Sequence, residues 1–304
     1  MIYCGTCLGL ALMSRPNHVV AVPVFAIAFL LAPLSRTLRV RQVLLLGAIT
    51  TLFLGATLAL NYLHFHDVFQ FGYPEQVEGG KILTDFSTPL HIGLYGLLFS
   101  PGKSLLLFAP PLLLALVGLP LLGHQNRPLA VVCGGCVMAY SLFLARHTQW
   151  EAGYSWGPRY LLPVVPLLLV GMAPLLRNVH RNWPQRALVV LCVLGVLVNL
   201  PAVFTSFFEI QSAGGYYDES YDYLLDHNAV GEQWGLLLRY LGEALLGQAL
   251  EGPLHQGIDL WSVMLLKDRV PLLGILLGLS LAVAGLTAGV LLRPRSGAQK
   301  KGQF

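Results

Sequence analysis

Residues 186–206 read RALVVLCVLGVLVNLPAVFTS, and this stretch decides the class of the fold. After Arg186 it contains no charged side chain. Its length matches the roughly 20 residues that an α-helix needs to cross the hydrocarbon core of a bilayer. Backbone groups inside lipid have no water to bond with, so such a segment must satisfy its hydrogen bonds as a helix. The stretch therefore predicts a transmembrane helix.

Similar apolar runs recur along the whole chain. Of its 304 residues, 55% are hydrophobic and only 11% are charged, against roughly 25% charged residues in soluble domains. We expect an all-α integral membrane protein with about seven full transmembrane helices plus a partial first one at residues 1–13, the end of an eighth span. The expected full spans are 17–34, 43–64, 103–122, 129–146, 159–176, 186–206 and 271–293.

The charges between these runs are sorted by sign, whereas a soluble surface mixes both signs. The segments that hold all 15 carboxylates alternate with segments whose charged residues are all Arg or Lys. Because basic segments stay in the cytoplasm, the pattern predicts that the acidic segments and the C-terminus lie on opposite sides of a bacterial cytoplasmic (inner) membrane, with the C-terminus inside. The net charge of +4 then reflects topology and gives no reason to expect nucleic acid as a partner. The acidic segments are 65–102, 147–158 and 207–270; the basic ones are 35–42, 123–128, 177–186 and the tail from Arg293.

The same pattern divides the chain into four parts. Residues 1–206 are predicted to form transmembrane helices with helical outer loops at 65–102 and 147–158. Residues 207–270 form an acidic extracytoplasmic segment, 271–293 the last transmembrane helix and 294–304 a cytoplasmic tail.

Two shorter helices are expected outside the spans. Residues 91–99 are apolar but too short to span, which predicts an interfacial or re-entrant helix. Residues near 231–250 have an amphipathic pattern that predicts a helix lying on the outer surface. The apolar face expected for it holds Trp234, Leu237, Leu238, Leu241 and Leu245.

Four cations break the orientation trend, because Arg15, Lys103, Arg146 and Arg159 lie at the outer ends of spans. A lipid phosphate at the headgroup level would offset their charge, since a guanidinium group binds phosphate oxygens through two hydrogen bonds. The alternatives are snorkelling at helix ends and pairing with an acid such as Glu151.

Other polar groups on the outer side could take part in chemistry. Asp67 and Glu151 are candidate catalytic carboxylates near the membrane. His64 and His66 lack an obvious third ligand, so no metal ligands are assigned, and the need for a cofactor such as a divalent metal stays open. The aromatic residues of 147–158 fit a belt at the headgroup level.

Several motifs resemble one group of bacterial membrane enzymes. The stretch 96–104 reads GLLFSPGKS and is followed by Pro110 and Pro111, while 150–160 reads WEAGYSWGPRY. The further blocks are Asn61-Tyr62-x-x-Phe65, Phe71-Gly72-Tyr73, Ser14-Arg15-Pro16 and Asp259-Leu260-Trp261. Together these resemble the GT-C superfamily of polyprenyl-phosphate-dependent glycosyltransferases, which is related to protein mannosyltransferases and lipid A aminoarabinose transferases.

The resemblance implies a membrane glycosyltransferase that moves a sugar from a polyprenyl-phosphate carrier to a lipid, glycan or protein acceptor on the extracytoplasmic side. It assigns the carrier phosphate to Arg15, Lys103 and Arg159. It places Trp150, Trp156, Tyr160 and Tyr73 along the substrate path.

Two features depart from the pattern. The chain matches the C-terminal part of such enzymes, so we expect the acidic motif of their first outer loop to be absent. Ala152 stands where a glycine is expected.

Two other functions compete with this one. A transporter of lipid-linked glycans predicts charged residues at mid-membrane depth, and the centres of the spans contain essentially none. A non-catalytic membrane scaffold or remnant would explain the absent acidic motif.

Overall fold

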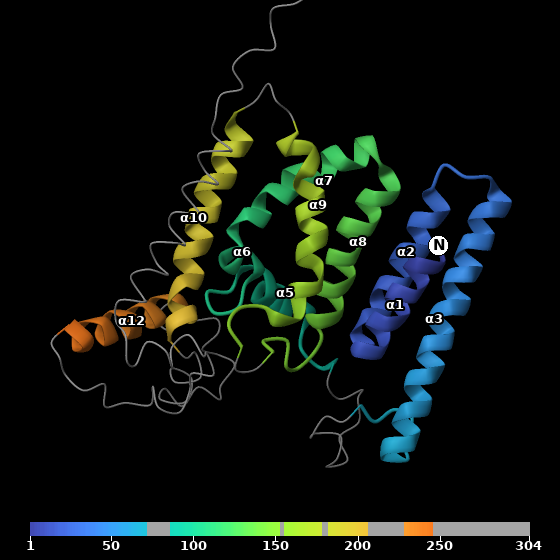
Figure 1. The fold of residues 1–304 in the computed structure, drawn as a ribbon, viewed down its shortest axis with the longest axis horizontal. Helices are drawn as coiled ribbons and strands as arrows, with labels where there is room; N and C mark the ends of the chain where they lie inside the picture. The colour runs from blue at the N-terminus through green and yellow to red at the C-terminus, as the bar shows by residue number, and fades with distance from the viewer. Residues whose placement is uncertain (72–85, 153–154, 178–181, 206–227, 246–304) are drawn as a thin grey trace, which may run out of the picture.

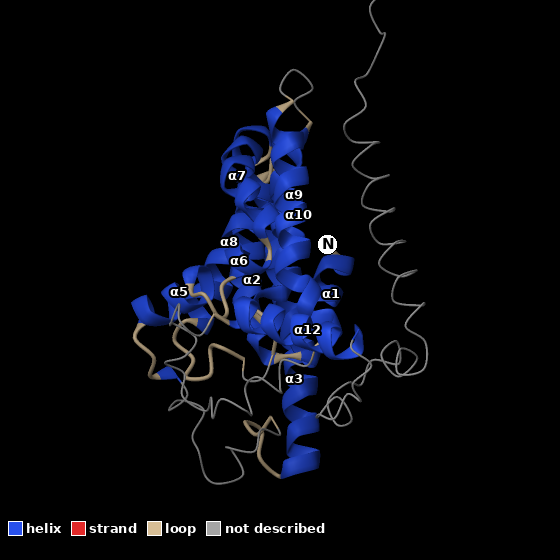
Figure 2. Ribbon diagram, turned by 90° about the vertical axis from the view of Figure 1, so that its left-hand side faces the viewer, coloured by secondary structure: helices blue, strands red, loops and turns tan. Residues whose placement is uncertain are grey.

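The fold is helical throughout the part of the chain that is described, namely residues 1–71, 86–152, 155–177, 182–205 and 228–245 of a computed structural model (Figures 1 and 2). No strand occurs among these residues. The elements in chain order are α1 (Ile2–Ser14), η1 (Pro16–Val20), α2 (Ala21–Leu31), α3 (Arg36–Phe65), α5 (Leu90–Phe99), α6 (Leu105–Phe108), η3 (Pro110–Leu112), α7 (Leu113–Gln125), α8 (Arg127–Leu144), η4 (Arg159–Val164), α9 (Val165–Leu176), α10 (Trp183–Phe204) and α12 (Ala229–Leu245).

Four segments among the described residues are long and apolar enough to cross a membrane. They are α3, α8, η4 together with α9, and α10. They coincide with the expected spans 43–64, 129–146, 159–176 and 186–206. The expected last span, 271–293, lies outside the described residues.

Two other expected spans differ from what the structure contains. The region 17–34 forms η1 and α2, which together are shorter than a full crossing. The region 103–122 is broken into α6, η3 and α7, with Ala109 at φ −134° and ψ 64°. Pro110 and Pro111 explain the break, because proline lacks an N–H and disfavours helical geometry in the residue before it.

The basic segment 35–42 is also not a loop. The helix α3 begins at Arg36, and Ser35 caps it by accepting a hydrogen bond from the Leu38 N–H at 3.4 Å. Ala32–Ser35 alone join α2 to α3. A run of arginines is compatible with helix, since arginine is a good helix former.

The long helices run between two ends of the molecule (Figure 1), and all the described carboxylates lie at one of these ends. The α2–α3 and α7–α8 connections, the end of α9 and the start of α10 lie at the top of Figure 1; we call this the basic end, because these elements carry Arg36, Arg39, Arg41, Arg127, Arg177 and Arg186. The opposite end carries Asp67 after α3, Glu151 after α8 and Glu232 in the first turn of α12; we call it the acidic end. This arrangement is compatible with a membrane protein.

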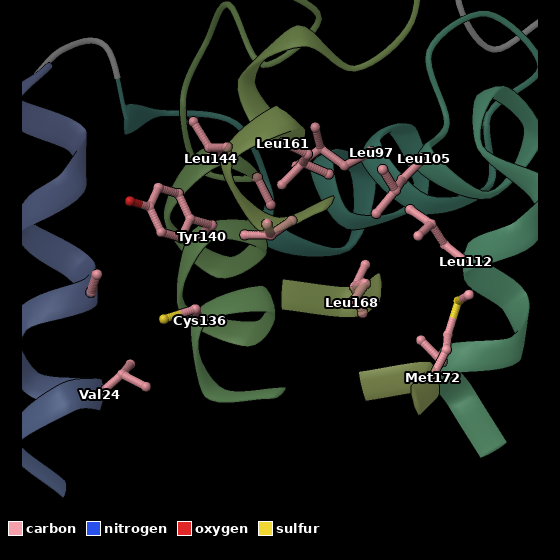
Figure 3. Packing of buried hydrophobic residues seen from close by; sticks show 14 of the residues in the cluster. Val24, Leu97, Leu105, Leu112, Cys136, Tyr140, Leu144, Leu161, Leu168 and Met172 are labelled. Atoms are coloured by element: carbon pink, nitrogen blue, oxygen red, sulfur yellow. The ribbon is translucent and has the colours of Figure 1, made fainter. Parts of the chain in front are cut away.

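The core lies among α6, α7, α8, η4 and α9. Leu105, Leu144, Leu161 and Leu168 are buried there in one cluster (Figure 3). The helix α8 is central, because it also packs against α2 and η1 on its other side. The N-terminal helices α1 and α3 pack together on the α2 side (Figure 1) and add Leu8 and Leu46 to the same cluster.

The predicted amphipathic helix exists as α12, which crosses the end of α10 at the acidic end (Figure 1). Its buried face includes Leu237, as predicted. It also includes Gln233 and Leu236, which were not predicted, whereas the predicted Leu238 is 61% exposed. Trp234 donates its Nε1–H to the Leu197 carbonyl at 2.9 Å, so an indole hydrogen bond helps to fix the rotation of the helix. The side chains of Leu241 and Leu245 lie outside the described residues.

Candidate functional site

The candidate site is centred on the segment between α8 and η4 at the acidic end, of which residues 145–152 and 155–158 are described; we call it the α8–η4 segment. The first residue that fixes this segment to the rest of the fold is Trp150, which is only 1% exposed. The indole ring lies so close to α5 that a Cβ on Gly96 would be 2.4 Å from Trp150 Cη2. Trp150, a predicted substrate-lining residue, is therefore a packing anchor between the segment and α5.

Lys103 is the second anchor, and it is fully buried. Its Nζ donates a hydrogen bond to the Ser155 carbonyl at 2.6 Å. Ser155 in turn donates its hydroxyl to the Ala152 carbonyl at 3.2 Å. In this conformation Lys103 holds the α8–η4 segment through its hydrogen bond to Ser155, and its buried ammonium group is not available at the surface to a lipid headgroup.

Ala152 is the point where the segment turns back on itself. Its φ of 62° puts a non-glycine residue in the left-handed region, which costs an L-amino acid roughly 1–2 kcal/mol. The turn lets the Ala152 carbonyl accept a hydrogen bond from Arg159 Nη2 at 3.2 Å. A glycine, expected here from the family resemblance, would take this conformation without the steric cost.

Trp156 connects the segment to α10. Its Nε1–H donates to Asn199 Oδ1 at 2.9 Å, and its ring meets Phe108 edge-on at 4.9 Å between centroids. Asn199 also donates through Nδ2 to the carbonyls of Phe108 and Gly195. Sequence reasoning missed Asn199, although an amide inside the apolar stretch 186–206 is a signal for such a role.

Tyr160 is where the two exposed arginines of the site meet. The Cζ atom of Arg15 lies 5.8 Å from the centre of the Tyr160 ring, and that of Arg159 lies 5.7 Å from it. Both distances are within the range of cation–π attraction. The fold thus brings together three predicted site residues from two distant parts of the sequence.

The two guanidinium groups have no anionic partner in the described part of the chain. Arg15, Arg146 and Arg159 form no ion pair with a carboxylate there, so the predicted alternative of pairing with an acid is not realised among these residues. Arg146 instead donates to the Phe86 carbonyl at 3.0 Å. Two exposed positive charges beside one aromatic ring form a surface that favours an anion.

A row of aromatic rings extends from Tyr160 through His147 and Phe86 to Phe143 in α8. The His147 ring lies 6.5 Å from the Tyr160 ring and 5.4 Å from that of Phe86, and Phe86 lies 5.0 Å from Phe143. The row is held in place by Thr88, which donates its hydroxyl to the His147 carbonyl at 3.0 Å. Aromatic rings from four positions thus lie next to one another, beginning at the Tyr160 ring that both arginines approach.

The candidate carboxylates take different places. Glu151 is half-buried and precedes Ala152 in the segment itself. Asp67 is exposed and accepts the Phe69 N–H at 2.9 Å, directly after α3, whose end lies away from the α8–η4 segment in Figure 1. Of the two candidates, Glu151 is therefore the one in the same segment as Arg159, next to the Ala152 carbonyl that Arg159 binds.

Two further predictions concern Tyr73 and metal ions. Tyr73 lies outside the described residues. Within the described ranges, no group of three His, Cys, Asp or Glu side chains gathers as a metal site. His64 is engaged with its own helix, through a hydrogen bond between Nδ1 and the Leu60 carbonyl at 2.8 Å.

Comparisons with known proteins give no family for this chain. No family model matches it, and neither a curated protein nor a solved structure shows significant similarity.

Proposed function

We propose that the chain is a membrane glycosyltransferase, which moves a sugar from a polyprenyl-phosphate carrier to a lipid, glycan or protein acceptor. In this proposal it lies in a bacterial cytoplasmic membrane with its acidic end outside and its C-terminus in the cytoplasm. The family resemblance of the 96–104 and 150–160 stretches motivates the reaction class.

One observation carries the proposal, namely the meeting of Arg15 and Arg159 at Tyr160. Both arginines are exposed and lack a carboxylate partner among the described residues. They lie at the ends of apolar helices, and we propose that these ends reach the depth where a lipid carries its phosphate. A phosphate that enters sideways from the bilayer would meet both guanidinium groups.

The chemistry follows from this placement. An acceptor hydroxyl oxygen forms a bond to the anomeric carbon of the sugar while the bond from that carbon to the phosphate oxygen breaks. The electron pair leaves with the polyprenyl phosphate, and the acceptor proton passes to a carboxylate, for which Glu151 is our candidate. Arg15 and Arg159 stabilise the negative charge that grows on the departing phosphate, while Lys103 and Trp150 hold the segment in place.

The test is sugar release from polyprenyl-phosphate sugars by the protein in nanodiscs. We expect Arg159→Ala to lower turnover by about 100-fold, the effect of removing a group that stabilises transition-state charge. Arg41→Ala is the matched control, because Arg41 is an exposed arginine at the basic end. It is expected to leave turnover unchanged.

The other outcomes separate the competing functions. Equal turnover of wild type and Arg159→Ala would remove Arg159 from the mechanism. Carrier binding without sugar release, across donors and acceptors, would contradict the glycosyltransferase. Movement of the carrier between leaflets in that case would favour the transporter, and its absence the scaffold. Binding of inorganic phosphate as tight as that of the carrier would contradict a lipid substrate.

A further inference from the structure

A polar pair lies at the turn that begins at Arg15, inside an otherwise apolar interface. His18 in η1 and Tyr140 in α8 are joined by a hydrogen bond between His18 Nδ1 and the Tyr140 hydroxyl. Their rings meet edge-on with centroids 5.7 Å apart. Tyr140 is buried, His18 is half-buried, and Figure 3 shows the Tyr140 hydroxyl pointing from α8 toward the N-terminal segment.

Packing alone gives no reason for this pair. The Tyr140 ring belongs to the apolar cluster that contains Cys136 and Leu144, where a phenylalanine would fill the same space. A buried hydroxyl in such surroundings is costly unless it is bonded, and His18 supplies the bond. Polar or ionisable pairs inside apolar helix interfaces commonly mark functional sites, and a satisfied pair fixes one relative position of its two elements.

The element that the pair fixes is the one that carries Arg15. Arg15 ends α1 with an extended backbone (φ −152°, ψ 122°), and the chain then turns into η1. The His18 N–H donates to the Arg15 carbonyl at 3.1 Å, so Arg15 and His18 belong to one turn. The side chain of His18 thus ties the turn that begins at Arg15 to α8.

The same helix also supports the other half of the site. Arg159 and Tyr160 begin η4, which packs against α8. The helix α8 is therefore the common frame on which the two arginines are set, with η4 on one side and η1 on the other.

We infer that His18 and Tyr140 are positioning residues, which hold Arg15 at Tyr160 so that the carrier phosphate meets two guanidinium groups at once. This inference rests on the proposed function. Without the bond, η1 is free to shift on α8 and Arg15 loses its fixed place beside the ring. Carrier affinity then falls although no group that touches the phosphate has been removed.

The test is a double-mutant cycle on the affinity for undecaprenyl phosphate, measured with the full chain in phosphatidylcholine nanodiscs. We expect Arg15→Ala to weaken binding about tenfold, the size of one lost charge-assisted contact, and Tyr140→Phe about fivefold. In the Arg15→Ala background, Tyr140→Phe is expected to have no further effect, because the residue acts through Arg15. Inorganic phosphate in the same assay reports whether the lipid chain is needed.

Each outcome has a separate meaning. Equal affinity of wild type and Arg15→Ala would contradict the phosphate site itself. An unchanged affinity for Tyr140→Phe alone, or the same fivefold loss in both backgrounds, would overturn only the positioning role. Tyr3→Phe is the matched control, since Tyr3 is 88% exposed on α1, and it is expected to bind as the wild type does.

Discussion

At the scale of single residues, Ala152 is the position where the backbone conformation of the site conflicts with the residue type. Its carbonyl accepts hydrogen bonds from Arg159 and Ser155, and its φ of 62° is what turns that carbonyl toward them. The turn therefore exists at the expense of steric strain in an L-residue.

We expect Ala152→Gly to be less destabilising than Ala145→Gly by about 1–2 kcal/mol, the cost of the left-handed region for alanine. The two alanines are both buried, but Ala145 has a right-handed φ of −62°. Thermal unfolding of the two variants in detergent measures the difference. An equal loss of stability in both would contradict the strain at Ala152.

Residue chemistry in the sequence indicated the site, but it did not distinguish the roles of the residues. Arg15 and Arg159 are recognisable because arginine is disfavoured at an outer helix end. Lys103 shares that signal, yet the fold buries it under the segment. Sequence position gives the depth of a side chain in a membrane but not its direction, which depends on contacts with other helices.

At the scale of elements, α5 sets the position of the site through close packing. A Cβ on Gly93 would lie 2.0 Å from the Ala145 carbonyl oxygen. Since the obstacle is backbone, a side chain at this position would push α5 away from the end of α8.

Gly93→Ala is accordingly expected to lower stability by about 1–3 kcal/mol, as overpacking does. The control is Gly134→Ala in α8, where a Cβ would meet nothing within 4 Å and the higher helix propensity of alanine is favourable by up to about 1 kcal/mol. Thermal unfolding followed by tryptophan fluorescence compares the two. If both variants melt like the wild type, the close approach of α5 is not present in solution.

Elements with long apolar runs were predictable, and those with local breaks were less so. The spans at α8 and α10 agree with their expected ranges to within about three residues, because hydrophobic length alone sets them. Pro110 and Pro111 indicate a kink, but whether a proline pair bends a helix or ends it at Ala109 depends on partners for the freed backbone groups. The face of α12 was predicted correctly at Leu237 but not at Gln233, a polar residue that is buried with a hydrogen bond to Thr205.

At the scale of the whole molecule, the separation of the basic and acidic ends can be tested directly. In a chain whose native cysteines are replaced, Gln149→Cys reports the acidic end and Thr37→Cys the basic end; both positions are exposed. We expect a membrane-impermeant maleimide to label Gln149→Cys on intact cells. Thr37→Cys is expected to react only after the cells are permeabilised.

The opposite labelling pattern would place the two arginines in the cytosol, and the proposed reaction would lose its extracytoplasmic substrate. Labelling of both positions on intact cells would contradict a bilayer between the two ends. Either result would leave the contacts at Tyr160 in place, so it would test the orientation separately from the geometry.

The proline break after α6 affects how α10 is attached to the rest of the fold. In the most apolar stretch of α10 only 6% of the residues are buried, so few apolar contacts hold this helix to its neighbours. Polar contacts add to its attachment. The Asn199 amide donates to the Phe108 carbonyl just before the break and accepts from the Trp156 indole, and the Leu197 carbonyl accepts from Trp234. An uninterrupted helix would keep that carbonyl for itself. The break after α6 thus frees a carbonyl that helps to hold α10. A continuous helix through 105–112 would remove this hydrogen bond and weaken the attachment of α10.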